Sequence, residues 1–99
     1  MLLARVIGNV VATHKSEKIA GFKFALLENI DPATMQGKKA YVVALDAVGA
    51  GSGEIVFYVS GSSARMTAVT EGKPTDATII AIVDQIEKDG QSVYQKANA

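Results

Sequence analysis

Apolar and polar side chains alternate along the first sixty residues, which is the pattern of β-strands that turn one face toward a core. The alternation predicts four strands: Leu2–Thr13, Phe22–Ile30, Ala40–Ala47 and Glu54–Ser60. Gly8 interrupts the first strand and indicates a bend or bulge there. Pro32 ends the second strand, because proline has no N–H to donate to a β-ladder.

Two of these strands, Ala40–Ala47 and Glu54–Ser60, are apolar on both faces. Such strands must be covered on both sides. The chain has only 99 residues, 48% of them apolar, and its mean hydropathy is positive. A domain of this size has too small an interior to bury that much apolar surface. We therefore expect part of it to be buried against another subunit.

The hydrophobic period changes after Ser60. Ser62 or Ser63 can cap a short helix that ends near Val69. A second helix is predicted to begin at Pro74-Thr75-Asp76, since four apolar residues follow at helical spacing: Ile79, Ile82, Val83 and Ile86. Ser92-Val93-Tyr94 reads as a short closing strand. Together the elements predict one domain over residues 1–99, mainly β, built as a small closed five-stranded barrel with two short helices.

The charge balance argues against several classes of partner. Ten basic and ten acidic residues cancel, so no strong field attracts nucleic acid or an anionic membrane. The chain has no cysteine, which excludes disulfides and thiolate metal sites. No apolar run approaches the roughly 18 residues of a membrane helix, and the first five residues do not resemble a signal peptide. We expect a soluble, intracellular domain.

A glycine-rich loop, Gly49-Ala50-Gly51-Ser52-Gly53, invites comparison with phosphate-binding loops. A Walker A loop needs Gly-Lys before Ser or Thr, whereas Gly53 is followed by Glu54. The predicted element after the loop is a strand, so no helix N-terminus would face a phosphate. Glycines that permit positive φ angles or a close backbone approach explain the loop better.

A second motif, Gly61-Ser62-Ser63-Ala64-Arg65, lies where a nucleophile elbow would sit, between a strand and a predicted helix. The elbow needs a second glycine at the position of Arg65. The single histidine, His14, lies in a polar turn among lysines, and helix capping explains the serines more simply. The carboxylates show no metal-ligand spacing. We identify no catalytic, cofactor-binding or metal-binding residue, so the sequence favours a building block over an enzyme.

Four blocks of sequence, in this order, make the chain resemble a known family. They are VIGNVVATHK (Val6–Lys15), ALDAVGAGSGE (Ala44–Glu54), SGSSAR (Ser60–Arg65) and PTDATIIAIVD (Pro74–Asp84). Together they resemble the EutN/CcmL family, the pentameric vertex proteins of bacterial microcompartment shells, over essentially the whole chain. The family usually has Val or Ile at the position of Thr75, which is a minor departure.

The resemblance implies an OB-like barrel that assembles as a homopentamer in the bacterial cytoplasm. Such rings close the corners of polyhedral shells built from hexameric tiles, as in carboxysomes and metabolosomes. No catalysis, cofactor, nucleic acid or membrane is implied. A ring repeats one head-to-tail interface, so each subunit needs two different contact surfaces.

The family context gives both motifs a structural interpretation. Six residues become candidates for a loop around the five-fold axis or its pore: Gly49, Ala50, Gly51, Ser52, Gly53 and Glu54. Five become candidates for docking to tiles or to a neighbouring subunit: Gly61, Ser62, Ser63, Ala64 and Arg65. Two alternatives stay open: an OB-type binding module for single-stranded nucleic acid or a small ligand, and, much weaker, a serine hydrolase that uses Ser63 with His14.

Overall fold

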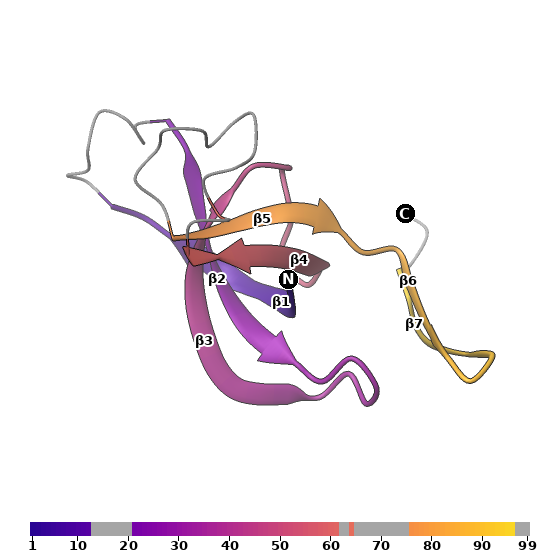
Figure 1. Cartoon of the computed structure of the whole chain (residues 1–99). Coiled ribbons are helices and arrows are strands. Elements are labelled where there is room, and N and C mark those ends of the chain that lie inside the picture. Colours follow the sequence, from indigo (N-terminus) through magenta and orange to yellow (C-terminus); the bar gives the residue numbers. More distant parts are fainter. Residues whose placement is uncertain (13–20, 62–63, 65–75, 97–99) are drawn as a thin grey trace.

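The chain folds into a closed barrel of five strands (Figure 1). The computed structural model describes residues 1–12, 21–61, 64 and 76–96. The barrel strands are β1 (Leu2–Val10), β2 (Lys23–Ile30), β3 (Gly37–Asp46), β4 (Ile55–Ser60) and β5 (Ala77–Ile82). They neighbour one another in the order β1-β2-β3-β5-β4, and β4 pairs with β1 to close the circle. All pairs are antiparallel except β3 with β5. The predicted mainly β, closed five-stranded barrel is confirmed.

The second predicted helix is wrong, because its residues form β5 and the first strand of a hairpin. This hairpin consists of β6 (Gln85–Lys88) and β7 (Gln91–Gln95), and it extends away from the barrel in Figure 1. The apolar spacing that suggested a helix also fits a buried strand, and the β-branched run Thr78-Ile79-Ile80 favours the strand. The fifth barrel strand is therefore β5, whereas the predicted closing strand belongs to the hairpin.

The first predicted helix, Ser62 to Val69, lies outside the described residues except for Ala64. Among the residues that the structure describes, no helix is long and apolar enough to cross a bilayer.

A bulge in β1 confirms the irregularity predicted at Gly8. Val6 lies opposite Leu27 of β2, but Gly8 lies opposite Leu26, so Ile7 is an extra residue without a partner in the register. A bulge bends its strand and increases the local twist, which helps a narrow sheet to close on itself. Ile7 is left 42% exposed on the outside of the barrel.

Every strand of the barrel contributes side chains to its interior, and many of these side chains are small. Its buried members are Ala4, Val6, Ala25, Leu27, Ala44, Val56, Tyr58, Ala77 and Ile79. One polar bond crosses this core, from the Tyr58 hydroxyl to Oδ1 of Asn29 at 2.6 Å. Tyr58 comes from β4 and Asn29 from β2, so the bond joins the two strands that flank β1.

A second core lies outside the barrel, between its wall and the β6–β7 hairpin. Its buried residues are Leu3, Ile30, Ile55 and Val83, against which Met35, Phe57, Ile86 and Tyr94 pack. The amide of Val83 also donates to the carbonyl of Ile55 at 2.8 Å. The second apolar face of β4 is therefore covered by the chain itself, through Val83 and the hairpin.

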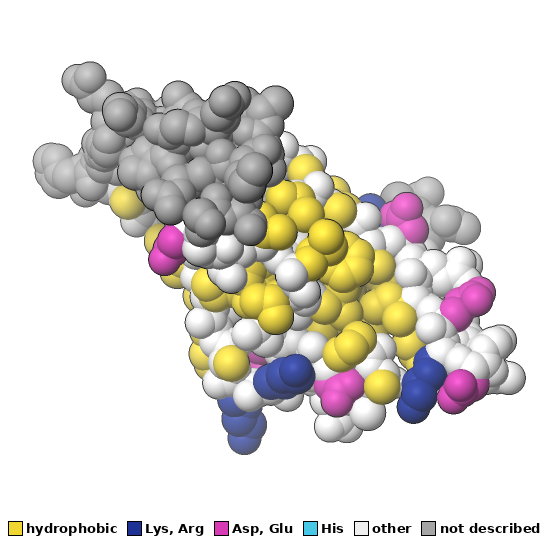
Figure 2. Space-filling model, viewed as in Figure 1, with side chains coloured by type: hydrophobic (Ala, Val, Ile, Leu, Met, Phe, Trp, Pro, Cys, Tyr) yellow, Lys and Arg dark blue, Asp and Glu magenta, His cyan; other side chains and the backbone are white. Residues whose placement is uncertain are grey.

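The outer face of β3 is uncovered at Tyr41 and Val43, whereas Leu45 in the same row is buried. Tyr41 is 58% and Val43 46% exposed, although both follow the alternation of a strand whose other face is in the core. Figure 2, seen from the side of Figure 1 on which β4, β5 and the N-terminus lie in front, shows further hydrophobic side chains gathered between the grey atoms and the hairpin. The burial of apolar strand surface against another subunit thus stays a prediction. Since the chain itself covers the outer face of β4, the prediction now concerns β3 and the strands beside it.

We predict that the Tyr58–Asn29 bond stabilises the barrel measurably. Tyr58→Phe and Asn29→Ala should each lower the free energy of unfolding, with a coupling of about 0.5–1.5 kcal/mol in a double-mutant cycle, as expected for a hydrogen bond between neutral groups. Urea unfolding of the wild type, both single variants and the double variant at one protein concentration measures it. Strictly additive losses would contradict the prediction.

Candidate functional site

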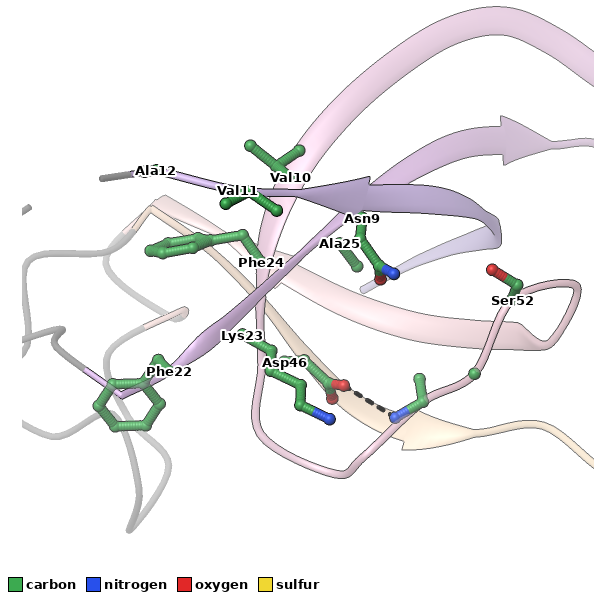
Figure 3. Close-up of a pocket in the computed structure, with 12 residues that line it drawn as sticks. Asn9, Val10, Val11, Ala12, Phe22, Lys23, Phe24, Ala25, Asp46 and Ser52 are labelled. Atoms are coloured by element: carbon green, nitrogen blue, oxygen red, sulfur yellow. Dashed lines mark hydrogen bonds between the residues drawn. The ribbon is translucent and has the colours of Figure 1, made fainter. Parts of the chain in front are cut away.

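The loop between β3 and β4 contains the first group of candidate residues, and Asp46 fixes its beginning. The Asp46 carboxylate accepts three backbone N–H groups: Oδ1 from Val48 and Gly49, and Oδ2 from Ala50, each at 2.9 Å. Figure 3 shows the last of these bonds as a dashed line. A carboxylate satisfied in this way holds the entering turn of the loop in one shape.

Glu54 fixes the end of the loop. Its Oε1 accepts the N–H of Gly51 at 2.5 Å, and its Oε2 pairs with Nζ of Lys96 at 2.6 Å. The Lys96 backbone N–H in turn donates to the carbonyl of Asp84 at 2.8 Å, which places the lysine at the base of the hairpin. The ion pair therefore ties the loop to the C-terminal hairpin of the same chain.

Each charged group of this ion pair stabilises the charged form of the other, so the pKa values of both groups are shifted. The hydrogen bond from Lys96, followed by that from the Gly51 N–H, lowers the pKa of Glu54 below its usual value. The same bond with Glu54 raises the pKa of Lys96. The Glu54 contribution to stability is present above its unfolded pKa and is lost as pH falls through the folded value. The Lys96 contribution is present below its unfolded pKa and is lost as pH rises through the folded value.

Backbone bonds attach the same loop to β1. The Gly53 N–H donates to the carbonyl of Val6 at 2.8 Å, and the Val6 N–H donates to the carbonyl of Glu54 at 2.9 Å. Gly49 and Gly53 have φ angles of 76° and 85°, which side chains other than glycine rarely adopt. The predicted need for positive φ is confirmed at these two glycines. At Gly51 the constraint is different, because a Cβ would lie 3.2 Å from Glu54 Oε1.

The tip of the loop presents small, neutral groups to its surroundings. Gly51, Ser52 and Gly53 are exposed, whereas Ala50 and Glu54 are partly buried. Because both carboxylate oxygens of Glu54 are engaged within the chain, the hydroxyl of Ser52 is more available to other molecules than the Glu54 carboxylate.

A hollow of about 500 Å³ lies beside the loop, where the barrel opens (Figure 3). The loop contributes Ala50, Gly51 and Ser52, and the rest of the lining comes from β1, β2, the ends of those strands, and Asp46. Its acidic group, Asp46, is already occupied by backbone N–H groups. In the part of the chain that the structure describes, no three acidic or histidine side chains gather as metal ligands would.

The second group of candidate residues is only partly visible. Gly61 is exposed, and its N–H donates to the carbonyl of Asp76 at 2.8 Å. Ala64 is fully buried, and its carbonyl accepts the buried Thr78 hydroxyl at 2.7 Å. The Ala64 side chain is therefore part of the fold and is not presented to a docking partner. Ser62, Ser63 and Arg65 lie outside the described residues, as does His14 of the hydrolase alternative.

Sequence reasoning did not identify Lys96 as part of this site. Lys96 lies far from Glu54 along the chain, and an isolated lysine near a C-terminus has no spacing that would reveal its partner. The structure brings Asp46, Glu54 and Lys96 to one loop, and it places Gly61 and Ala64 at the far end of β4 from that loop.

We predict that Lys96→Gln raises the pKa of Glu54 toward its ordinary value, because the variant removes the largest cause of the lowered pKa. Titration of the Glu54 side-chain carboxyl carbon by NMR measures the change. Lys88→Gln, which removes the same charge from the exposed end of β6 near the hairpin turn, serves as the matched control and should leave the pKa of Glu54 unchanged. Equal titration curves for Glu54 in the wild type and Lys96→Gln would refute the ion pair.

Comparison with known proteins agrees with this architecture. The model of the family described as ethanolamine utilisation protein EutN/carboxysome matches residues 1–84. The carboxysome shell vertex protein CcmL of Gloeobacter violaceus is 43% identical over 96 residues, which cover 97% of this chain and 95% of that protein. The bacterial microcompartment shell vertex protein EutN of Escherichia coli is 42% identical over 97 residues, covering 97% of this chain and all of that protein.

Solved structures extend the likeness to the fold. The structure of Gloeobacter violaceus CcmL superposes with a TM-score of 0.91 at 42% identity, covering 97% of this chain and 98% of that chain. A pentameric microcompartment shell protein, GrpN from Rhodospirillum rubrum, superposes with a TM-score of 0.80 at 38% identity, covering 89% of this chain and 99% of that chain. With matches of this extent in both sequence and fold, the chain belongs to the EutN/CcmL family.

Proposed function

We propose that this chain is a structural subunit of a bacterial microcompartment shell, where it forms a homopentamer that closes the vertices and docks to hexameric tiles. It would act in the bacterial cytoplasm without catalysis or a cofactor. The observation that carries the proposal is the near full-length match to a pentameric microcompartment shell protein at 38% identity. The shell vertex proteins CcmL and EutN, similar over 97% of this chain, support the same role.

The geometry of the chain suits such a role. A flat layer of hexagonal tiles cannot close into a polyhedron, so a five-fold unit has to occupy each corner. A five-fold ring requires a rigid wedge with fixed contact surfaces, and a closed barrel supplies one. The loop Gly49–Glu54, which we place around the five-fold axis, is fixed by bonds within its own subunit that involve Asp46, Glu54 and Lys96. Its shape therefore does not depend on the neighbouring subunit.

We predict that the purified protein has the mass of five 10.4 kDa chains in solution. Native mass spectrometry and light scattering after size exclusion, over a range of protein concentrations, measure it directly. A monomer that gains mass only when single-stranded oligonucleotide is added would contradict the proposal and favour the OB-type binding module instead.

Arg65 remains a candidate for docking to tiles. We predict that Arg65→Ala still forms the ring but co-assembles poorly with hexameric shell proteins, because the guanidinium can make several directed hydrogen bonds across an interface. Electron microscopy of shells formed by co-expression measures closure. Lys88→Ala, a loss of charge at the exposed end of β6, is the control and should leave closure intact. Closed shells in normal numbers with Arg65→Ala would remove Arg65 from the docking surface.

A further inference from the structure

We infer that the ring interface joins two different surfaces of the barrel. One is the β2–β3 face, formed by Leu26, Tyr41 and Val43. The other is an apolar groove, the N-terminal groove, whose walls include Met1, Leu2, Pro32, Lys38, Phe57 and Ile86. In this arrangement the β2–β3 face of one copy packs into the N-terminal groove of the next. The inference rests on the proposed ring and specifies how it is built.

The β2–β3 face is apolar and uncovered. The strand register places Leu26 opposite Val43 and Glu28 opposite Tyr41, so these side chains form adjacent rows on the outside of the barrel. Tyr41 is 58% and Val43 46% exposed, and Ile7, at the bulge next to Leu26, extends the same surface onto β1. An exposed aromatic residue that is contiguous with branched aliphatic residues is typical of a protein interface.

The charges on this face balance each other. Arg5 lies opposite Glu28 across the β1–β2 pair, next to the row that contains Tyr41. Opposite charges in directly facing cross-strand positions offset each other. Arg5 and Glu28 therefore add no net charge to the face, and the charge beside it is that of the exposed Lys39, two residues before Tyr41 on β3. A single uncompensated charge is costly to bury, so the Lys39 ammonium has to stay at the margin of the contact.

The N-terminal groove offers a receptor of suitable size and chemistry. It has a volume of about 390 Å³, which lies within the range of roughly 300–1,000 Å³ typical of binding pockets. Met1 is 79% and Leu2 45% exposed, so this apolar wall is not closed by the chain itself. Phe57 and Ile86 line the groove from β4 and the hairpin, where they also pack on the second core, so the groove floor is fixed.

The second copy is the occupant that fits both surfaces at once. The groove and the β2–β3 face are formed by different residues, although Ile30 of β2 and Lys38 of β3 line the side of the groove that continues these two strands. Most of the remaining apolar wall comes from β1, β4 and β6. A head-to-tail ring needs two such non-overlapping surfaces, whereas a single face that paired with itself would stop at a dimer. The pentameric relative that matches 89% of this chain supports a ring over a dimer.

Charge substitutions on each surface, combined by mixing, test the inference. Tyr41→Lys and Leu2→Lys should each abolish the pentamer and give folded monomers, because each buries an unpaired ammonium in the interface. Equimolar mixing of the two variants should give a heterodimer and no larger species, since each contributes one intact surface. Native mass spectrometry identifies the species, and far-UV circular dichroism checks the fold. Gln91→Lys, on the exposed hairpin tip, is the control and should remain pentameric.

The possible outcomes separate this inference from the proposed function. If the wild type is pentameric and either lysine variant is too, the interface lies elsewhere and the ring stands. Monomers that do not pair on mixing would show that the two surfaces do not face each other. A wild type that forms no pentamer overturns both statements. If a lysine variant fails to fold, Tyr41→Ser and Leu2→Ser replace it, and each should weaken the ring at least tenfold on dilution.

Discussion

The narrow interior of a five-stranded barrel is the constraint on which the rest of this structure depends. Of the nine described residues that are buried in the inner core, four are alanines, because facing strands leave little room between them. Only a few large side chains fit beside these alanines, and other large side chains of the same strands point outward. The chain covers some of them with its own C-terminal hairpin, which packs Ile86 and Tyr94 against the outer face of β1 and β4. On β3 the corresponding residues, Tyr41 and Val43, remain exposed.

In the glycine-rich loop, polar groups form hydrogen bonds with one another within the same chain. They therefore need no partner from another molecule. Asp46 bonds three amides at one end, and Glu54 bonds Gly51 and Lys96 at the other. A loop with this many internal bonds is already ordered, so it would lose little conformational freedom in the proposed ring. The same bonds occupy both carboxylates, so the exposed tip is chemically neutral.

The sequence predicted the parts of the fold that depend on local pattern. Alternation located four strands, and Gly8 marked the bulge that the register of β1 and β2 confirms. The segment from Ala77 to Ile86 was misread as a helix, because apolar residues buried on both faces show no strand alternation. With this segment assigned to a helix, the β6–β7 hairpin was not predicted. Its packing against the outer face of β4, and the exposure of Tyr41 and Val43 on β3, therefore became evident only in the structure. The pair between Glu54 and Lys96 joins distant segments, and no local pattern reveals it.

The uncovered surface also helps to distinguish a self-associating shell subunit from an OB-type module that binds single-stranded nucleic acid. A barrel that binds single-stranded nucleic acid exposes aromatic side chains along a groove of one sign of charge. Here the exposed aromatic residue, Tyr41, neighbours Val43, and the nearby Arg5 lies opposite Glu28. A surface made mainly of apolar side chains, with basic and acidic groups of mixed sign beside it, suits another apolar surface better than a polyanion. Part of the outer wall of the barrel is left without a cover, and a further copy of the chain, as proposed above, would supply one through its own open apolar groove.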